Sequence, residues 1–428
     1  MRRLSRTLGP VAVAVLALTA AGCGGGSGSS DSSSSSDSSS SSSPSADSGG
    51  GDADLLVWTD SLKIDAVKQV AEDFGEANGI NVKVQAISED LQGSFVTADA
   101  AGNGPDVVVG AHDWIGNLVQ NGAIDPLNLA PDELSGYSEK AVQATTYDGK
   151  LYGVPYGIEA LALYRNTEVA PDEPATMDDA IAEGEAAVKA GKVDSALNLP
   201  VGELGDAYHM EPILTSFGGY IFSYDDATGY DAQDVGIGKE GSIKAAEEIS
   251  KLAQSKVLRT SISGDNSIAL FTSGKAAFLV SGPWALADVK KAGFDYAIQP
   301  VPGFAGQGDA APFMGAQAFM VAAHGTNKDI AQEFVNNGVN SEDAMMTLYE
   351  GTQLPPAMTA VQDQVDDPDL SVFTEAANVA APMPAIPAMA SVWEPLGKAY
   401  AAIVSGKDPA ATIKSAGDTI TKAIADAG

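Results

Sequence analysis

Residues 55–86 read LLVWTDSLKIDAVKQVAEDFGEANGINVKVQA. The apolar run 55–58 predicts a short buried strand. Apolar residues then recur at the spacing of a helix, which a polar residue between 59 and 61 can cap and which Asn78-Gly79 ends: Ile64, Val67, Val70, Ala71 and Phe74. Alternation of apolar and polar residues over 80–86 predicts a second strand. A strand, a helix and a strand within about 30 residues form a βαβ unit, which predicts a parallel α/β sheet with right-handed crossovers.

Two further strands are predicted at 106–109 and 276–280, and each is followed by a segment that contains a tryptophan. Together with the first strand, they deliver polar groups and tryptophans at three strand ends: 58–61, 112–114 and 281–284. In open α/β sheets, ligands bind beyond the carboxyl ends of the strands. We therefore expect a binding site where these segments meet.

The composition excludes several classes of protein. The 428-residue chain has 24 Lys and Arg against 57 Asp and Glu, a formal net charge of −33, so nucleic acid is not an expected partner, because phosphate binding needs a basic surface. Its single cysteine excludes a disulfide framework and a cysteine-based metal site. Single cores stop growing near ~250–300 residues, so we expect at least two lobes.

Motifs of catalysis and of cofactor binding are missing from the sequence. It contains no phosphate-binding glycine loop that opens a helix, no G-x-S-x-G and no H-E-x-x-H. His112, His209 and His324 are scattered, and we interpret each as a surface or hydrogen-bonding residue. With 57 acidic residues, some pair will always resemble the two carboxylates of a glycosidase, so that pattern has no weight alone. We predict no cofactor, no metal site and no enzymatic activity.

The first 53 residues are not part of the predicted fold. Residues 1–10 carry three arginines, and the apolar run 11–21 is shorter than the ~20 residues of a membrane-spanning helix. The run ends in LTAAGC, with small residues before the chain's single cysteine, and resembles a bacterial lipoprotein signal. The resemblance implies that residues 1–22 are a cleaved signal peptide and that Cys23 is lipidated. Residues 23–53, mostly Ser, Gly and Asp, are the expected tether, so we expect the folded part at the outer face of the cell membrane.

Short sequence blocks occur in collinear order through nearly all of residues 54–428. They are GPDVV at 104–108 with AHD at 111–113, YDGKLYGVP at 147–155, EALALYRN at 159–166, FGGY at 217–220 with DVG at 234–236, GPWA at 282–285, and MPAIP at 383–387 through Trp393. Together they resemble the extracellular solute-binding proteins of carbohydrate ABC importers, in particular the maltose/maltodextrin-binding protein group.

That resemblance implies an α/β fold of the periplasmic-binding-protein type. Each of its two lobes would be a mainly parallel sheet flanked by helices, with the ligand cleft between the lobes. Lobe one would comprise 54–158 plus 314–365, and lobe two 159–313 plus 366–428. The lobes would close on a maltose- or maltodextrin-like oligosaccharide and deliver it to the permease subunits of an ABC importer. We expect a monomer that contacts the membrane through its lipid anchor.

A sugar site needs carboxylates or amides for the hydroxyls and aromatic rings for the apolar C–H faces. By the resemblance, Asp113 accepts sugar hydroxyls, Glu159 lies at the lobe crossing, and Trp284 and Trp393 stack on the sugar. The full set of expected ligand-binding residues is Asp60, Lys63, Asp113, Trp114, Glu159, Asp206, Tyr208, Trp284 and Trp393. A purely structural role is also open for several of them: a helix cap for Asp113, a salt bridge for Glu159 and core packing for the tryptophans.

Three positions depart from the family pattern. Gly110 stands where the maltose-binding proteins have a tryptophan, and Trp114 and Gly397 stand where they have arginines. These changes predict a different contact pattern on one lobe, so a cyclic, branched or differently linked oligosaccharide is an alternative to a maltodextrin. The sequence is also compatible with the same fold binding another glycan or a polyol, with a secreted glycan-active enzyme, and with a surface sensor.

Overall fold

The computed structural model describes residues 53–225 and 229–427. The predicted signal peptide 1–22, the predicted lipidation site Cys23 and the predicted tether up to residue 52 lie outside the described residues. Within the described ranges, no helix is long and apolar enough to span a membrane.

The predicted βαβ unit is confirmed. It consists of β1 (Leu55–Thr59), α1 (Ile64–Asn78) and β2 (Val82–Ala86), and the two strands pair in parallel. The helix ends at Gly79, whose φ of 67° is in the left-handed region, where glycine has no Cβ to clash. Before the helix, the Asp60 carboxylate accepts hydrogen bonds from the amides of Leu62 and Lys63. Local sequence signals therefore determine both ends of this unit.

Sheet one contains this unit and has the strand order β2-β1-β3-β14-β4, with β7 also paired to β14. The added strands are β3 (Val107–Ala111), β4 (Ile124–Asp125), β7 (Val154–Glu159) and β14 (Gly315–Ala322). Successive residues of β3 enter cores on opposite faces of the sheet: Val107 and Val109 on one, Val108 on the other.

Sheet two has the strand order β13-β8-β12-β9. Its strands are β8 (Ala162–Asn166), β9 (Ser195–Asn198), β12 (Ala276–Ser281) and β13 (Tyr296–Pro300). It also has a core on each face, with Leu163 and Phe278 in one and Tyr164 and Leu279 in the other. Two short antiparallel pairs lie outside the main sheets: β5 (Thr146–Tyr147) with β6 (Lys150–Leu151), and β10 (Phe222–Asp225) with β11 (Gly229–Val235).

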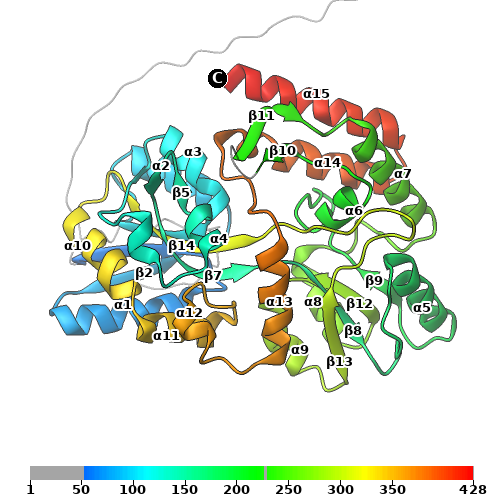
Figure 1. The fold of residues 1–428 in the computed structure, drawn as a ribbon, viewed down its shortest axis with the longest axis horizontal. Helices are drawn as coiled ribbons and strands as arrows, with labels where there is room; N and C mark the ends of the chain where they lie inside the picture. Colours follow the sequence, from blue (N-terminus) through cyan, green and yellow to red (C-terminus); the bar gives the residue numbers. More distant parts are fainter. Residues whose placement is uncertain (1–52, 226–228, 428) are drawn as a thin grey trace, which may run out of the picture. The chain divides into compact units, whose positions relative to one another are not determined.

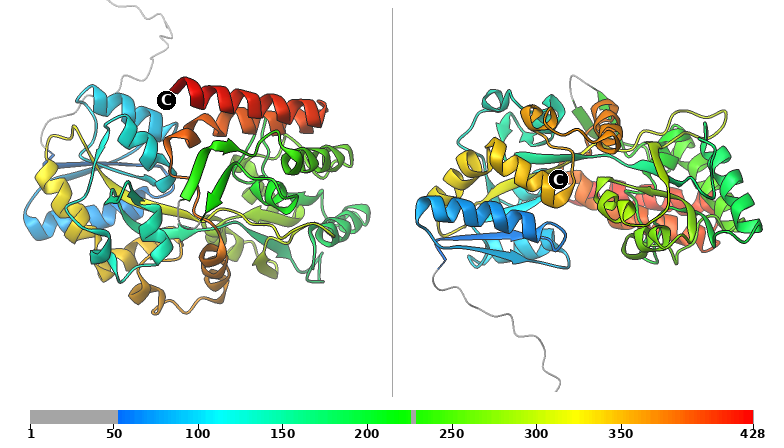
Figure 2. Two further views of the ribbon diagram at one scale, coloured as in Figure 1. Left: turned by 45° about the horizontal axis from the view of Figure 1, so that its top comes forward. Right: turned by 90° about the horizontal axis from the view of Figure 1, so that it is seen from below.

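Helices flank both sheets (Figures 1 and 2). Those of the sheet-one side are α1, α2 (Leu91–Ala100), α3 (Ile115–Gln120), α4 (Glu139–Ala144), α10 (Lys328–Glu333) with the π-helical turn Phe334–Val339, α11 (Glu342–Thr352) and α12 (Thr359–Gln362). Those of the sheet-two side are α5 (Met177–Lys189), α6 (Glu211–Ser216), α7 (Glu240–Gln254), α8 (Gly264–Thr272), α9 (Leu286–Lys290), α14 (Trp393–Val404) and α15 (Pro409–Ala427). Short 3₁₀ turns lie at His112–Trp114, Pro131–Leu134, Pro283–Ala285 and Pro387–Ser391. The mixed α/β fold of the solute-binding type is thus as expected.

The prediction of mainly parallel sheets is confirmed for strand direction: among the described strands, β14 alone runs against the other five of sheet one, and β8 alone runs against the other three of sheet two. Among the described strands, parallel pairing within the sheets occurs in β2-β1-β3 and between β9 and β12, and the other pairs are antiparallel. The chain leaves sheet one after β7 and returns to it at β14, where Gly315 lies opposite Glu159. The strands of departure and return, β7 and β14, lie side by side and run in opposite directions.

Three chain segments connect the two sheets and lie close together. The first joins β7 to β8 at residues 159–162, the second leads into β14 through Met314, and the third passes through residues 381–383. The amide of Met314 donates to the carbonyl of Ala381 at 2.9 Å, and the amide of Met383 donates to the carbonyl of Met314 at 2.9 Å. Helix α13 (Pro368–Val379) precedes the third segment, with Leu370 and Phe373 in a core of sheet two and Ala376 and Ala377 in a core of sheet one.

Candidate functional site

Two tryptophans at strand ends lie directly on glycines. Trp114 follows β3, and a Cβ atom on Gly110 would lie 2.1 Å from Cζ3 of its ring. Trp284 follows β12, and a Cβ atom on Gly282 would likewise lie 2.1 Å from Cζ3 of its ring. Each ring therefore occupies the space that a side chain at the glycine would need. This contact explains the departure at Gly110: the ring of Trp114 takes the place where a side chain at 110 would lie.

Asp113 is buried beside Trp114, with 7% of the residue exposed. Its Oδ1 atom has no hydrogen-bond partner in the described part of the chain, while the side chain of Trp393 supplies a hydrogen bond to the carboxyl group. Burial raises the pKa of Asp113 to about 7, and the Trp393 hydrogen bond counteracts part of that rise. The site therefore has a desolvated acceptor that can pair with a ligand hydroxyl.

Glu159 is the last residue of β7 and lies at the first connecting segment. Its Oε1 atom accepts a hydrogen bond of 3.2 Å from Nε2 of Gln317, and its side chain packs on Gly315. Burial raises the pKa of Glu159, and the positive charge of Lys63 is the strongest opposing influence. Lys63 itself forms an ion pair with Asp60. Charges from the end of β1 therefore act on a carboxylate at the first connecting segment.

Asp206, Tyr208 and Trp284 form a second cluster with a histidine that the sequence analysis did not assign to the site. The Asp206 carboxylate accepts the backbone amide of His209 at 2.9 Å, and its other oxygen lies 2.7 Å from Nδ1 of the same histidine. The Trp284 ring lies 6.3 Å from that of Tyr208 and 6.1 Å from that of His209, centroid to centroid. The spacing D-x-x-H is the sequence signal that could have identified the Asp206–His209 pair.

The hydroxyl of Tyr208 is buried and has no hydrogen-bond partner among residues 53–225 and 229–427. Burial raises the pKa of Tyr208 well above its usual value, and the charges of Glu159, Asp206 and Asp113 raise it further. The charges of Asp113 and Glu159 thus act on Tyr208 of the second cluster, so the two clusters lie near each other although their residues come from both sheets. Of the expected set, contacts join Asp60 to Lys63, Trp393 to Asp113, and Tyr208 and Asp206 to the Trp284–His209 group. Charge effects on pKa values link Glu159 to Lys63, Asp113 and Tyr208. Trp114 is instead partly buried against the sheet-one core that includes Val108.

The departure at Gly397 also has a structural basis. Gly397 lies on α14, one turn after Trp393, so the two residues share a helix face. The loop that carries Asp206 is packed against it: a Cβ atom on Gly205 would lie 1.7 Å from the carbonyl oxygen of Gly397. A Cβ atom on Gly397 would itself lie 3.2 Å from the backbone carbonyl of Gly205, so a side chain at 397 would require this loop to shift by a few tenths of an ångström.

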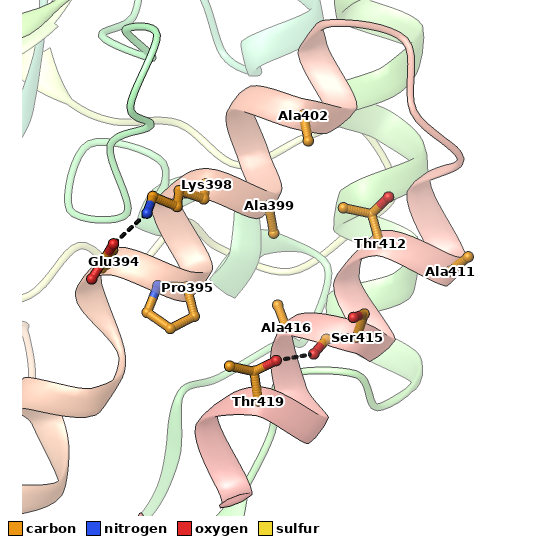
Figure 3. Close-up of a pocket in the computed structure, with 10 residues that line it drawn as sticks. All are labelled: Glu394, Pro395, Lys398, Ala399, Ala402, Ala411, Thr412, Ser415, Ala416 and Thr419. Atoms are coloured by element: carbon orange, nitrogen blue, oxygen red, sulfur yellow. Dashed lines mark hydrogen bonds and ion pairs between the residues drawn. The ribbon is translucent and has the colours of Figure 1, made fainter. Parts of the chain in front are cut away.

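A groove of about 650 Å³ lies between α14 and α15 (Figure 3) and shares no lining residue with these clusters. Its lining is largely alanine and threonine, and its charged pair, Glu394 with Lys398, is an exposed contact within one helix. Ten residues line it: Glu394, Pro395, Lys398, Ala399, Ala402, Ala411, Thr412, Ser415, Ala416 and Thr419. It lacks the aromatic rings of a sugar site. Elsewhere in the described chain, no three His, Cys, Asp or Glu side chains are grouped to hold a metal ion.

The chain is similar in sequence to known binding proteins. Residues 69–381 match the family described as bacterial extracellular solute-binding protein. The galactooligosaccharide-binding protein of Bacillus subtilis is 29% identical over 86% of this chain and 88% of its own length, and the maltodextrin-binding protein MdxE of the same organism is 29% identical over 83% and 85%. A maltooligosaccharide ABC transporter solute-binding lipoprotein of Streptococcus pneumoniae is 26% identical over 86% and 87%.

Proposed function

Because this chain belongs to the bacterial extracellular solute-binding protein family, we propose that it captures an oligosaccharide outside the cell and delivers it to an ABC importer. The observation that carries the proposal is the pairing of unsatisfied polar atoms with an aromatic surface. Asp113 Oδ1 and the Tyr208 hydroxyl are buried without partners in the described chain, and the Trp284 ring lies beside that of Tyr208. A sugar supplies hydroxyls for the first two groups and a C–H face for the rings.

The proposed ligand is an oligosaccharide of the maltose or maltodextrin kind. Relatives named for galactooligosaccharides, maltodextrins and maltooligosaccharides support the broader class, an oligosaccharide. The Trp114 ring packs on Gly110, which supports a set of ligand contacts on one lobe that differs from that of the maltose-binding proteins. The proposed ligand-binding residues are therefore those of the two clusters, with Trp114 as an additional aromatic surface.

Lobe closure is the proposed means of capture. Separate cores around sheet one and sheet two support the proposed lobes, 54–158 with 314–365 and 159–313 with 366–428. The charge of Lys63 at the end of β1 and that of His209 near α6 both act on Glu159 at the connecting segment, so closure brings groups of both lobes around one ligand. Cys23 is the proposed lipid anchor, and streptococcal relatives named as lipoproteins support it.

A glycan-active enzyme is the second candidate, because two carboxyl groups of the site, Asp113 and Glu159, have raised pKa values as glycosidase acids do. The absence of catalytic motifs from the sequence and the names of the relatives, all binding proteins, favour binding without chemistry. Substrate conversion distinguishes the two.

Titration of the purified protein with maltotriose, a galactooligosaccharide and a cyclodextrin, followed by tryptophan fluorescence, tests the proposal. We expect saturable binding of at least one sugar, and chromatography should recover that sugar intact after prolonged incubation. Trp284→Ala and Glu159→Ala should each weaken binding by at least ~1 kcal/mol, through lost stacking and lost charge-assisted hydrogen bonds. Glu240→Ala, an exposed carboxylate on α7, is the matched control and should bind as the parent does. Hydrolysed sugar would instead support the enzyme.

A further inference from the structure

A second cavity, of about 420 Å³, lies between α6, the β10–β11 pair and two of the connecting segments. Aromatic side chains dominate its wall: Tyr220, Phe222, Tyr224, Tyr230 and Phe313. Ala311 and Ala381 close it on the side of the connecting segments, and it shares no lining residue with the candidate sugar site. It is therefore a separate place in the molecule where a small ligand can be held.

Glu211 is the acidic group of this wall. The residue is 2% exposed, and its Oε2 atom has no hydrogen-bond partner in the described part of the chain. A buried carboxyl group without a partner lowers stability, so a native structure that keeps one calls for an explanation. Because the group lines a cavity, a bound donor can pair with this oxygen.

The charges around Glu211 favour a cation as that donor. The described lining contains no lysine or arginine. At the rim, Lys239 lies over the Tyr220 ring, 5.3 Å from its centroid, but is paired with Asp234. The rings of Tyr224 and Tyr230 lie 4.7 Å apart, and the faces of such rings attract cations. An ammonium group provides N–H donors for Oε2 and a positive charge for both the carboxylate and the rings.

We propose that this cavity is a binding site for a small primary ammonium compound, with Glu211 as its counter-ion and Tyr220, Tyr224 and Tyr230 as its aromatic wall. The site is independent of which oligosaccharide the protein carries. Before the cation binds, burial raises the pKa of Glu211 to about 8, so the carboxyl group is mostly protonated at pH 7. Binding of the cation displaces that proton to the solvent and leaves a carboxylate–ammonium pair.

The neighbouring titratable groups do not obscure this proton release. Burial raises the pKa values of Tyr230 and Tyr400, and the charge of Glu211 raises both further. Both hydroxyls therefore stay protonated at neutral pH. Tyr230 donates its hydroxyl hydrogen to the carbonyl of Pro382 at 2.6 Å, and Asp234 remains ionised beside Lys239, which lowers its pKa. Glu211 is therefore the carboxyl whose protonation changes.

Isothermal titration calorimetry with n-butylammonium, in buffers of different ionisation enthalpy at pH 7, tests the site, and n-butanol is the uncharged probe of equal length. The full chain should bind n-butylammonium saturably with a Kd of about 1 mM or tighter and release roughly half a proton to one proton per site. Glu211→Gln should weaken binding at least about tenfold and abolish proton release. Glu394→Gln, an exposed carboxylate in the other groove, is the matched control and should change neither.

Circular dichroism and thermal melting establish that Glu211→Gln is folded, and Tyr224→Ala, which removes one ring of the wall, gives a second reduction in affinity. No saturable heat with n-butylammonium up to tens of millimolar would overturn the proposal. Equal binding of n-butanol, or unchanged binding by folded Glu211→Gln, would also overturn it.

Discussion

The Nδ1 atom of His112 accepts a hydrogen bond from the backbone amide of Ala316, 3.0 Å away, on the strand that re-enters sheet one. Its Nε2 atom lies 2.9 Å from the carbonyl oxygen of Met383, on the third connecting segment. One neutral imidazole, with its proton on Nε2, therefore joins a strand end, β14 and a connecting segment. Burial lowers the pKa of His112 to about 4, which keeps the ring neutral.

Replacement of His112 should destabilise the protein in a way that depends on pH. His112→Ala loses two hydrogen bonds and leaves a cavity, so we expect a loss of about 2–4 kcal/mol at pH 7. The pKa of His112 is lower in the folded than in the unfolded protein, so between about pH 6.5 and pH 4 the unfolded state binds one more proton. The parent therefore loses stability as the pH falls through that window, by about 3 kcal/mol at most.

The measurement is urea denaturation of both proteins at pH 7.5 and pH 4.5. The alanine variant has no imidazole to protonate, so its deficit relative to the parent should shrink at the lower pH. An equal loss of stability at both pH values would show that burial does not lower the pKa of His112.

Asp113→Asn should separate stability from ligand binding. The pKa of Asp113 is raised by burial to about 7, so ionisation costs stability as the pH rises from about 4 through 7, and that cost is absent below this window. At pH 8 the asparagine variant should be about 1–3 kcal/mol more stable than the parent, and at pH 4 the two should be nearly equal. Sugar affinity should fall at least about tenfold through loss of a charged acceptor.

Denaturation curves and fluorescence titrations at both pH values check this pair of effects. Asp418→Asn, an exposed carboxylate on α15, should alter neither quantity. Undiminished affinity in Asp113→Asn would remove Asp113 from the site.

Gly110→Ala should be costly because of Trp114. The new Cβ atom would meet the indole ring at 2.1 Å, so the ring must move, and we expect a destabilisation of about 1–3 kcal/mol. Gly136→Ala is the matched control, since a Cβ atom there meets nothing within 4 Å. A double-mutant cycle with Trp114→Ala isolates the contact: in the Trp114→Ala background, Gly110→Ala should add little. An additive cycle in urea denaturation would mean that the two residues do not interact.

Removal of a single tyrosine hydroxyl should have opposite effects at two buried positions. Tyr208→Phe deletes a hydroxyl without a partner in the described chain, so stability should rise by about 1 kcal/mol while sugar affinity falls. Tyr164→Phe deletes a hydroxyl that donates to the carbonyl of Gly282 at 2.7 Å, so stability should fall by about 1 kcal/mol or more. Thermal melting and sugar titration of the two variants give the comparison, and a stability loss in both would show that Tyr208 has a partner.

The sequence alone predicted those parts of the fold that nearby residues encode. The spacing of Ile64, Val67, Val70 and Ala71 defines helix α1, and glycine at 79 ends it, because these effects act within one or two helical turns. Aromatic and polar residues immediately after apolar runs predicted a binding site at the strand ends, and the collinear blocks identified the family and, through it, a sugar as the expected ligand. These signals require no knowledge of distant contacts.

Only the tertiary structure decided what surrounds those residues. Asp113 follows β3 and Glu159 ends β7, and the charges that act most on Glu159 are those of Lys63 and Asp60 after β1, so no local pattern could reveal their shared environment. The antiparallel β14, the Trp114 ring on Gly110 and the buried Glu211 likewise follow from how distant segments pack. The physical reason is that propensity acts over a few residues, whereas desolvation and steric exclusion depend on whatever the fold brings into contact.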